Sequence, residues 1–165
     1  MQSIEPNELA PMVQKAIDIA CQVHARKADR YGRPFLGHVI GVARFLEGEV
    51  ALTCGLLHDL MEDDPSWTPD RLRAEGFSEE VIKVLDRLTR RSGENYTSYI
   101  RRIEDDKLSC YIKIYDLLDN LDDRRLVQRH VKKYKAALKL LLKRLRNLDM
   151  SLYLKIFATP CLVQY

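Results

Sequence analysis

The sequence has no long hydrophobic run and no export signal at its start. No apolar stretch approaches the roughly 18–20 residues that are needed to cross a bilayer. Residues 1–16 carry acids and prolines, whereas a secretory signal begins with a basic segment followed by an apolar one. We therefore expect a cytoplasmic protein that does not span a membrane.

Cysteines are few, and they are scattered along the chain. The four thiols belong to Cys21, Cys54, Cys110 and Cys161, and no two of them form a C-x-x-C pair. This spacing argues against a disulfide framework and against a zinc–cysteine site, so we expect buried free thiols. A length of 165 residues suits one domain with a single core.

Paired strand patterns, internal repeats and low-complexity tracts are also missing, and most of the chain has helical periodicity. Apolar residues recur at helical spacing in residues 9–26, 38–46, 96–104 and 108–121, and the very apolar segment 49–61 predicts one buried helix. Loops interrupt the pattern at "ADRYGRPFLGH" and "DDPSWTPD". Thr68 and Ser78 are predicted N-caps. The class is all-α.

The net charge of +3 hides an uneven distribution. Residues 104–123 contain seven acids and two lysines, whereas residues 124–146 contain ten Lys/Arg and no acid. The basic stretch also has an apolar stripe with steps of four and three residues, formed by Val127, Val131, Tyr134, Leu138, Leu141, Leu145 and Leu148. This predicts a helix that packs its seam on the body and exposes its cations, although a second subunit could use the same seam.

Several residues able to bind a metal occur in or beside apolar segments. His58 and Asp59 lie in "GLLHDLMEDD", Asp116 lies in "IKIYDLLDNL", and His38 begins an earlier helical pattern. Burying a carboxylate is costly without a partner, and a divalent ion such as Mn²⁺, Mg²⁺ or Fe²⁺ accepts mixed imidazole and carboxylate ligands. Hydrogen bonds more often satisfy such a residue when it stands alone.

Two further acids follow the histidine–aspartate pair. Glu62 comes four residues after His58, and Asp63 comes four residues after Asp59. On a continuous helix each pair would share a face, which would bring both carboxylates beside the ion, where they could activate a water molecule. Acids at the end of a helix oppose its dipole, so ordinary capping does not explain them.

Five segments together resemble the HD-domain metal phosphohydrolases, most closely the hydrolase domains of RelA/SpoT-type enzymes and the small alarmone hydrolases. In chain order they are "GRPFLGH", "GLLHDLMEDD", "GFSEEVIKVLDRLTRR", "ENYTSYIRRI" and "IKIYDLLDNLDDRR". The resemblance covers roughly residues 16–134. It implies an HD-domain helical bundle over residues 1–150, with residues 151–165 as a C-terminal extension of uncertain structure.

The same resemblance implies a site and an activity. The ligands of one Mn²⁺ ion would be His38, His58, Asp59 and Asp116, and the acids that activate the water would be Glu62 and Asp63. The reaction would be removal of the 3′-pyrophosphate from ppGpp and pppGpp by a stand-alone enzyme.

Three further residues would contact this small-molecule nucleotide substrate. Asn120 corresponds to a position near the ribose and phosphate, and either Lys27 or Arg30 corresponds to a basic phosphate contact. The chain departs from the family pattern at Phe35, where tyrosine is commoner, and at Val39, where proline usually follows the histidine.

Two alternatives remain open. The substrate could be another nucleotide, such as a dNTP or the 2′-phosphate of NADPH, because no base-reading motif is present. The basic stretch could instead belong to a module that binds nucleic acid or a protein partner. That second alternative leaves the histidine and aspartate residues unexplained, so nucleic acid is the less favoured partner.

Overall fold

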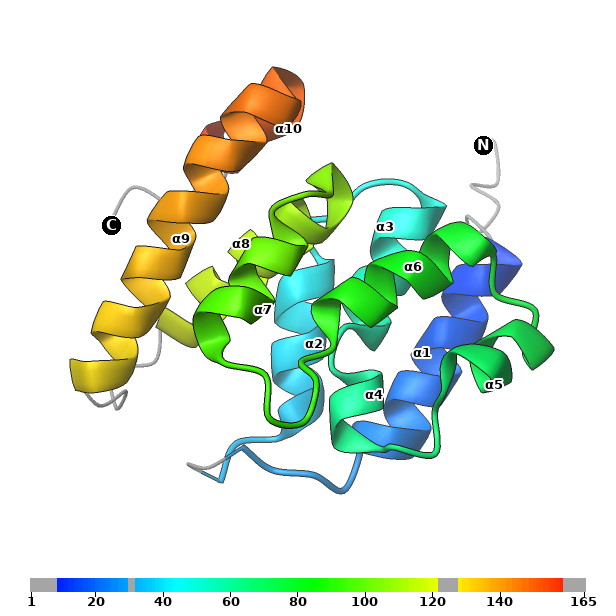
Figure 1. Ribbon diagram of the computed structural model, residues 1–165. Helices are drawn as coiled ribbons and strands as arrows, with labels where there is room; N and C mark the ends of the chain where they lie inside the picture. Colours follow the sequence, from blue (N-terminus) through cyan, green and yellow to red (C-terminus); the bar gives the residue numbers. More distant parts are fainter. Residues whose placement is uncertain (1–8, 30–31, 122–127, 159–165) are drawn as a thin grey trace, which may run out of the picture.

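The computed structural model describes residues 9–29, 32–121 and 128–158, which form ten helices and no β-sheet (Figure 1). The helices are α1 (Pro11–His24), α2 (Phe35–Ala43), α3 (Glu49–Leu57), α4 (Leu60–Asp63), α5 (Pro69–Ala74), α6 (Glu79–Leu88), α7 (Tyr96–Ile103), α8 (Lys107–Leu121), α9 (Gln128–Leu148) and α10 (Met150–Ala158). The predicted all-α class is confirmed. No helix in the described parts is long and apolar enough to cross a membrane.

Helix α3 is the central element of the core. It packs against α1, α2, α6 and α8, and most of its residues are buried, as its largely apolar sequence predicts. At Gly55 a side chain would collide with Leu46, because an ideal Cβ would lie 2.3 Å from Leu46 Cδ1. The same Cβ would lie 3.4 Å from Ala43 Cα, so this glycine leaves room for the end of α2 to approach α3 closely.

The prediction of one continuous helix over residues 49–61 is wrong. Helix α3 ends at Leu57, and a new short helix, α4, begins at Leu60. Between them Asp59 has φ −100° and ψ 0°, in the sparsely populated bridge region. Adjacent residues on a regular helix point about 100° apart. The break lets His58 and Asp59 turn toward one point.

The predicted N-caps of α5 and α6 are confirmed. Thr68 Oγ1 accepts a hydrogen bond from the Arg71 backbone N–H at 3.2 Å, and Ser78 Oγ accepts one from Val81 at 3.3 Å. Each cap satisfies a backbone donor that the first helical turn leaves unpaired. These caps fix where the two helices begin.

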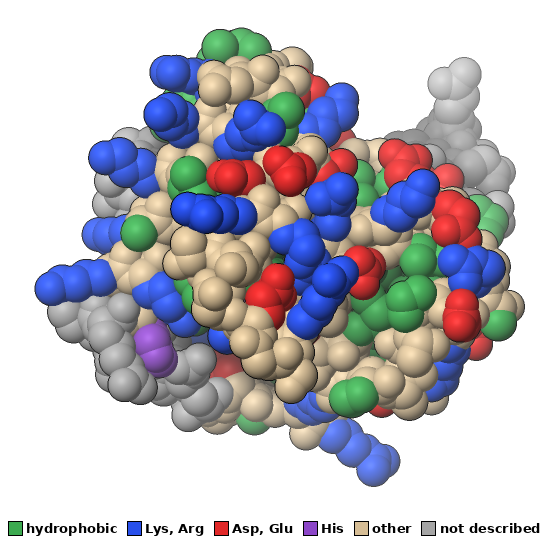
Figure 2. All heavy atoms as spheres, viewed as in Figure 1, with side chains coloured by type: hydrophobic (Ala, Val, Ile, Leu, Met, Phe, Trp, Pro, Cys, Tyr) green, Lys and Arg blue, Asp and Glu red, His purple; other side chains and the backbone are tan. Residues whose placement is uncertain are grey.

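Helices α8 and α9 lie side by side, and α10 packs against α9 (Figure 1). From the predicted stripe of α9, Leu138, Leu141 and Leu145 are buried, whereas Leu148 is 39% exposed and Val127 lies outside the described residues. Lysines and arginines gather on the outer surface of α9 (Figure 2). The middle of the seam therefore packs within the chain, and most of the described cations of α9 are exposed.

The segment after residue 150 is helical where the structure describes it. Helix α10 buries Ile156 completely, while Met150, Leu154 and Phe157 are at least half exposed. Residues 159–165, which include Cys161, lie outside the described residues. Cys54 and Cys110 are buried free thiols, and Cys21 is a partly exposed one.

Candidate metal centre

Four residues from distant parts of the chain meet beside the core. His38 comes from α2, His58 and Asp59 from the break between α3 and α4, and Asp116 from α8. One ligand atom from each of His38, His58 and Asp59 lies within 4.8 Å of the other two. The Nε2 atoms of His38 and His58 are 3.2 Å apart. Asp59 Oδ2 lies 3.5 Å from His38 Nε2 and 3.3 Å from His58 Nε2.

Asp116 adds a further carboxylate to this group. Its Oδ1 lies 3.3 Å from His38 Nε2 and 3.9 Å from His58 Nε2, and its side chain is almost fully buried. The fold thus brings together the four residues that the sequence predicts as metal ligands. Their binding of an ion stays a prediction.

The histidines and carboxylates of the cluster shift one another's pKa values toward their charged forms. Burial lowers the pKa of His38 and of His58, but the neighbouring carboxylates outweigh it and raise both pKa values. Burial likewise raises the pKa of Asp59 and of Asp116, and nearby cations outweigh that effect and lower both. Two imidazoles and two ionised carboxylates form a donor set that fits a divalent cation, which would replace the imidazole protons.

The Nδ1 atom of each histidine lies within hydrogen-bond distance of an acceptor oxygen. His58 Nδ1 lies 2.7 Å from the Gly55 carbonyl oxygen, and His38 Nδ1 lies 2.7 Å from Asp119 Oδ2. Both partners accept a hydrogen bond, so each ring carries its proton on Nδ1 and directs Nε2 at the cluster when it is neutral. Asp119 is not among the residues that the sequence predicts.

Asp116 has two polar neighbours on its own helix. Lys113 Nζ forms an ion pair with Asp116 Oδ2, and Asn120 Nδ2 donates to Asp116 Oδ1 at 2.5 Å and to the Asp116 carbonyl at 2.9 Å. Burial lowers the pKa of Lys113, but Asp116 outweighs it and raises that pKa. Asn120 thus lies beside a predicted ligand, and its predicted contact with substrate stays a prediction.

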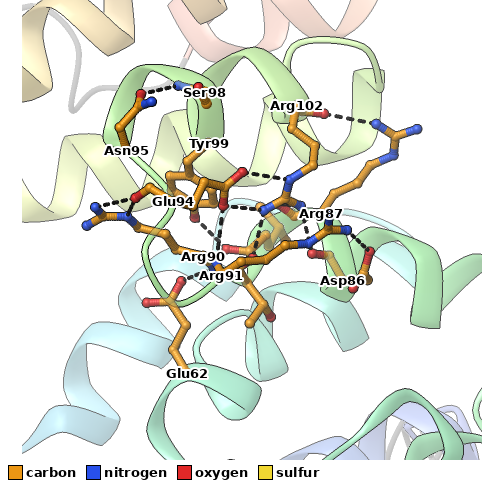
Figure 3. A network of polar contacts seen from close by, with 12 residues as sticks. Glu62, Asp86, Arg87, Arg90, Arg91, Glu94, Asn95, Ser98, Tyr99 and Arg102 are labelled. Atoms are coloured by element: carbon orange, nitrogen blue, oxygen red, sulfur yellow. Dashed lines mark hydrogen bonds and ion pairs between the residues drawn. The ribbon is translucent and has the colours of Figure 1, made fainter.

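Glu62 is solvent-exposed and is anchored by a backbone group. Its Oε1 accepts a hydrogen bond from the Arg90 N–H at 2.5 Å (Figure 3). The carboxyl group keeps part of its exposure, but its partial loss of hydration raises the pKa of Glu62. The Arg90 N–H opposes this rise, and the carboxylates of Asp59 and Asp116 add to it. Glu62 therefore shares the electrostatic environment of Asp59 and Asp116.

An arginine network holds the loop that carries Arg90. Arg102 forms an ion pair with Glu94 at 2.9 Å and donates to the carbonyl oxygens of Arg87 and Thr89, at the end of α6 (Figure 3). Glu94 O in turn accepts from the guanidinium of Arg90. The guanidinium of Arg102 therefore satisfies carbonyls that the helix end leaves unpaired, and it fixes the loop next to Glu62.

Asp63 contacts different groups from Glu62. Its Oδ2 lies 3.2 Å from His24 Nδ1 and 3.7 Å from Lys27 Nζ, and Lys27 also donates to the Asp63 carbonyl at 2.8 Å. His24 is buried, and its ring lies against Phe35 with centroids 5.1 Å apart. The expectation that Glu62 and Asp63 share a helix face with His58 and Asp59 assumed one continuous helix. The break between α3 and α4 removes that assumption.

The loop before α2 places Lys27 beside Asp63 and the first residue of α2. The Phe35 N–H donates to the Lys27 carbonyl at 3.0 Å, and the Asp29 N–H donates to the Arg33 carbonyl at 2.8 Å. Gly32 completes the turn with φ +81°, a conformation that favours glycine. Arg30, the alternative phosphate contact, lies outside the described residues.

The sequence contained a signal for some of the missed residues but not for others. Lys113 and Asp119 lie three residues before and after Asp116, so helical spacing puts all three on one face of α8. His24 and Arg90 have no comparable local pattern. Their contacts with Asp63 and Glu62 arise only when separate elements pack together.

Comparison with known proteins reveals several relatives, although no protein-family model matches the chain. It is 30% identical over 133 residues to a probable GTP pyrophosphokinase of Mycobacterium leprae, covering 73% of this chain and 17% of that protein. It is 27% identical over 124 residues to a guanosine-3′,5′-bis(diphosphate) 3′-pyrophosphohydrolase of Aquifex aeolicus, covering 68% of this chain and 18% of that protein. The human protein of that name, MESH1, is 33% identical over 88 residues, covering 48% of each chain.

These matches span less than half the length of each of the three relatives. A solved structure matches almost the whole fold, with a TM-score of 0.71 and 21% identity over 93% of this chain and 96% of the other. That protein is described as a metazoan orthologue of SpoT that hydrolyses ppGpp. The chain therefore has the helical HD-domain fold and is related to the RelA/SpoT-type and small alarmone hydrolases.

Proposed function

We propose that the chain is a cytoplasmic, Mn²⁺-dependent phosphohydrolase that removes the 3′-pyrophosphate of ppGpp and pppGpp. The observation that carries the proposal is the convergence of His38, His58 and Asp59 within 4.8 Å, with Asp116 beside them. Relatives named as ppGpp pyrophosphohydrolases support the substrate.

The cluster would hold the ion through two nitrogens and two oxygens. The histidines would contribute Nε2 atoms, and Asp59 and Asp116 would contribute carboxylate oxygens. This mixed set suits Mn²⁺ and also accepts Mg²⁺ or Fe²⁺. When bound, such an ion polarises a phosphoryl oxygen and lowers the pKa of water.

Glu62 is the residue that we propose to accept the proton of the attacking water. Arg90 holds one carboxylate oxygen, Oε1, so the side chain has a defined orientation. Its raised pKa moves the group toward the working pH, where a general base is most effective.

Asp63 supports the same reaction in a second way. Its contacts with Lys27 and His24 suggest that it holds the Lys27 ammonium beside the site. A pyrophosphate group needs nearby cations, and Lys27, Arg30 and the amide of Asn120 are the proposed contacts. We also propose, as the sequence analysis expects, that the Asp63 carboxylate helps to activate the attacking water.

The test is a metal and substrate assay on the purified protein. Metal content is measured by mass spectrometry, and release of pyrophosphate from ppGpp is measured with and without added Mn²⁺. A panel containing a dNTP and NADPH is run in parallel, with Asp116→Ala as the inactive control. We expect Mn²⁺-dependent release from ppGpp.

The panel separates the parts of the proposal. If the Mn²⁺-loaded protein cleaves a dNTP or NADPH and leaves ppGpp intact, the substrate is wrong and the metal hydrolase stands. If no nucleotide is cleaved and no ion is retained, the phosphohydrolase proposal itself fails.

A further inference from the structure

We infer that Asp119 is a positioning residue for the metal centre, acting through His38. The inference deepens the proposed function, because it rests on the proposed metal site. Asp119 Oδ2 lies 2.7 Å from His38 Nδ1, the ring nitrogen that does not face the cluster. The carboxylate is only partly buried, at 31% side-chain exposure, and it belongs to α8.

The two nitrogens of His38 serve different partners. Nε2 lies 3.2 Å from His58 Nε2 and 3.3 Å from Asp116 Oδ1, at the centre of the cluster. Nδ1 lies on the other edge of the ring and meets Asp119. A carboxylate in that position keeps the proton on Nδ1, sets the rotation of the ring, and makes Nε2 a better donor to a metal.

The other histidine does not need such a side chain. His58 Nδ1 is held by the carbonyl of Gly55, a backbone group of the same helix end. His38 has no comparable backbone acceptor among its described contacts, and its orientation depends on a residue 81 positions away. Asp119 therefore links α8 to α2 as well as orienting the ligand.

Gly41 provides the space for this contact. An ideal Cβ at Gly41 would lie 2.6 Å from Asp119 Oδ1, a distance that forces the carboxylate to move. Gly37, on the same helix, has nothing within 4 Å of its ideal Cβ. Glycine is unfavourable inside a helix, so its presence opposite Asp119 is explained by the room it leaves.

The test measures Mn²⁺ affinity by isothermal titration calorimetry on the purified chain. We expect Asp119→Ala to bind Mn²⁺ about 10–100-fold more weakly. Asp119→Asn, which keeps an acceptor oxygen without the charge, should recover part of that loss. Gly41→Ala should also weaken binding, and Gly37→Ala is the matched control that should bind like the wild type.

A double-mutant cycle shows whether the two residues act through one contact. Gly41→Ala should add little to Asp119→Ala, because the carboxylate that it displaces is already gone. The electron paramagnetic resonance spectrum of bound Mn²⁺ should change in Asp119→Ala, since the ligand geometry changes. Melting of the metal-free variants checks that they are folded.

Each result has a distinct meaning. If the wild type binds Mn²⁺ and Asp119→Ala binds equally tightly, the positioning role is wrong and the metal site stands. Additive effects of Gly41→Ala and Asp119→Ala would also overturn it. If the wild type itself binds no Mn²⁺, the proposed metal site fails and this inference fails with it.

Discussion

Single residues decide the charge of the candidate metal centre. Asp59 and Asp116 stay ionised because the surrounding cations outweigh the effect of burial on their pKa values. Removing either carboxylate takes away an oxygen ligand and leaves two histidines facing each other. The cluster would then attract a cation less strongly, because it has lost one negative charge and one ligand atom.

The Asp59→Ala variant should lose both the metal and the activity. Metal content by mass spectrometry and pyrophosphate release from ppGpp are measured on the same preparation. Asp70→Ala is the control, because that carboxylate is 94% exposed on α5. A variant at Asp59 that retained a full complement of metal would show that this residue is not a ligand.

The Glu62→Gln variant should separate metal binding from catalysis. Glutamine keeps an oxygen that can accept from the Arg90 N–H, but it cannot take a proton from water. We expect normal metal content and activity lower by about 10²–10⁴-fold, the range typical of a lost general base. Near wild-type activity would remove the catalytic role of Glu62.

At the scale of elements, the loop between α6 and α7 is tied down by Arg102 and Glu94 (Figure 3). The Arg102 side chain lowers the pKa of Glu94 to about 2. A carboxylate whose pKa is lower in the folded state stabilises the fold above its ordinary pKa, and that contribution is lost as the pH falls through the lowered one.

The stability effect of Glu94→Gln should accordingly depend on pH. In urea unfolding, the variant should be less stable than the wild type at pH 7, and the difference should shrink as the pH falls from about 4.5 toward 2. Glu104→Gln, just beyond the other end of α7, is the control. A difference that stayed constant over this range would contradict the ion pair.

At the scale of the whole molecule, the candidate ligands join α2, the α3–α4 break and α8. An ion that binds all of them stabilises the folded state, because the unfolded chain cannot present the same set. Metal binding and tertiary packing should therefore be coupled.

Added Mn²⁺ should raise the melting temperature. At a concentration 100 times the Kd, the gain is about 2.7 kcal/mol, which corresponds to roughly 5–10 °C for a chain of this size. Differential scanning calorimetry with and without Mn²⁺ measures the shift. Asp116→Ala should show almost none, and an equal shift in that variant would point to a nonspecific effect of the ion.

Local patterns in the sequence were sufficient for the helical class, for the caps at Thr68 and Ser78, and for naming the residues that meet at the cluster. These features depend on neighbours within one or two turns, or on motifs that keep their spacing. Tertiary structure alone decided that the helix breaks at His58–Asp59 and that Asp119 supports His38 from 81 residues away. Contacts of this kind depend on how separate helices pack, and periodicity along one segment carries no information about that packing.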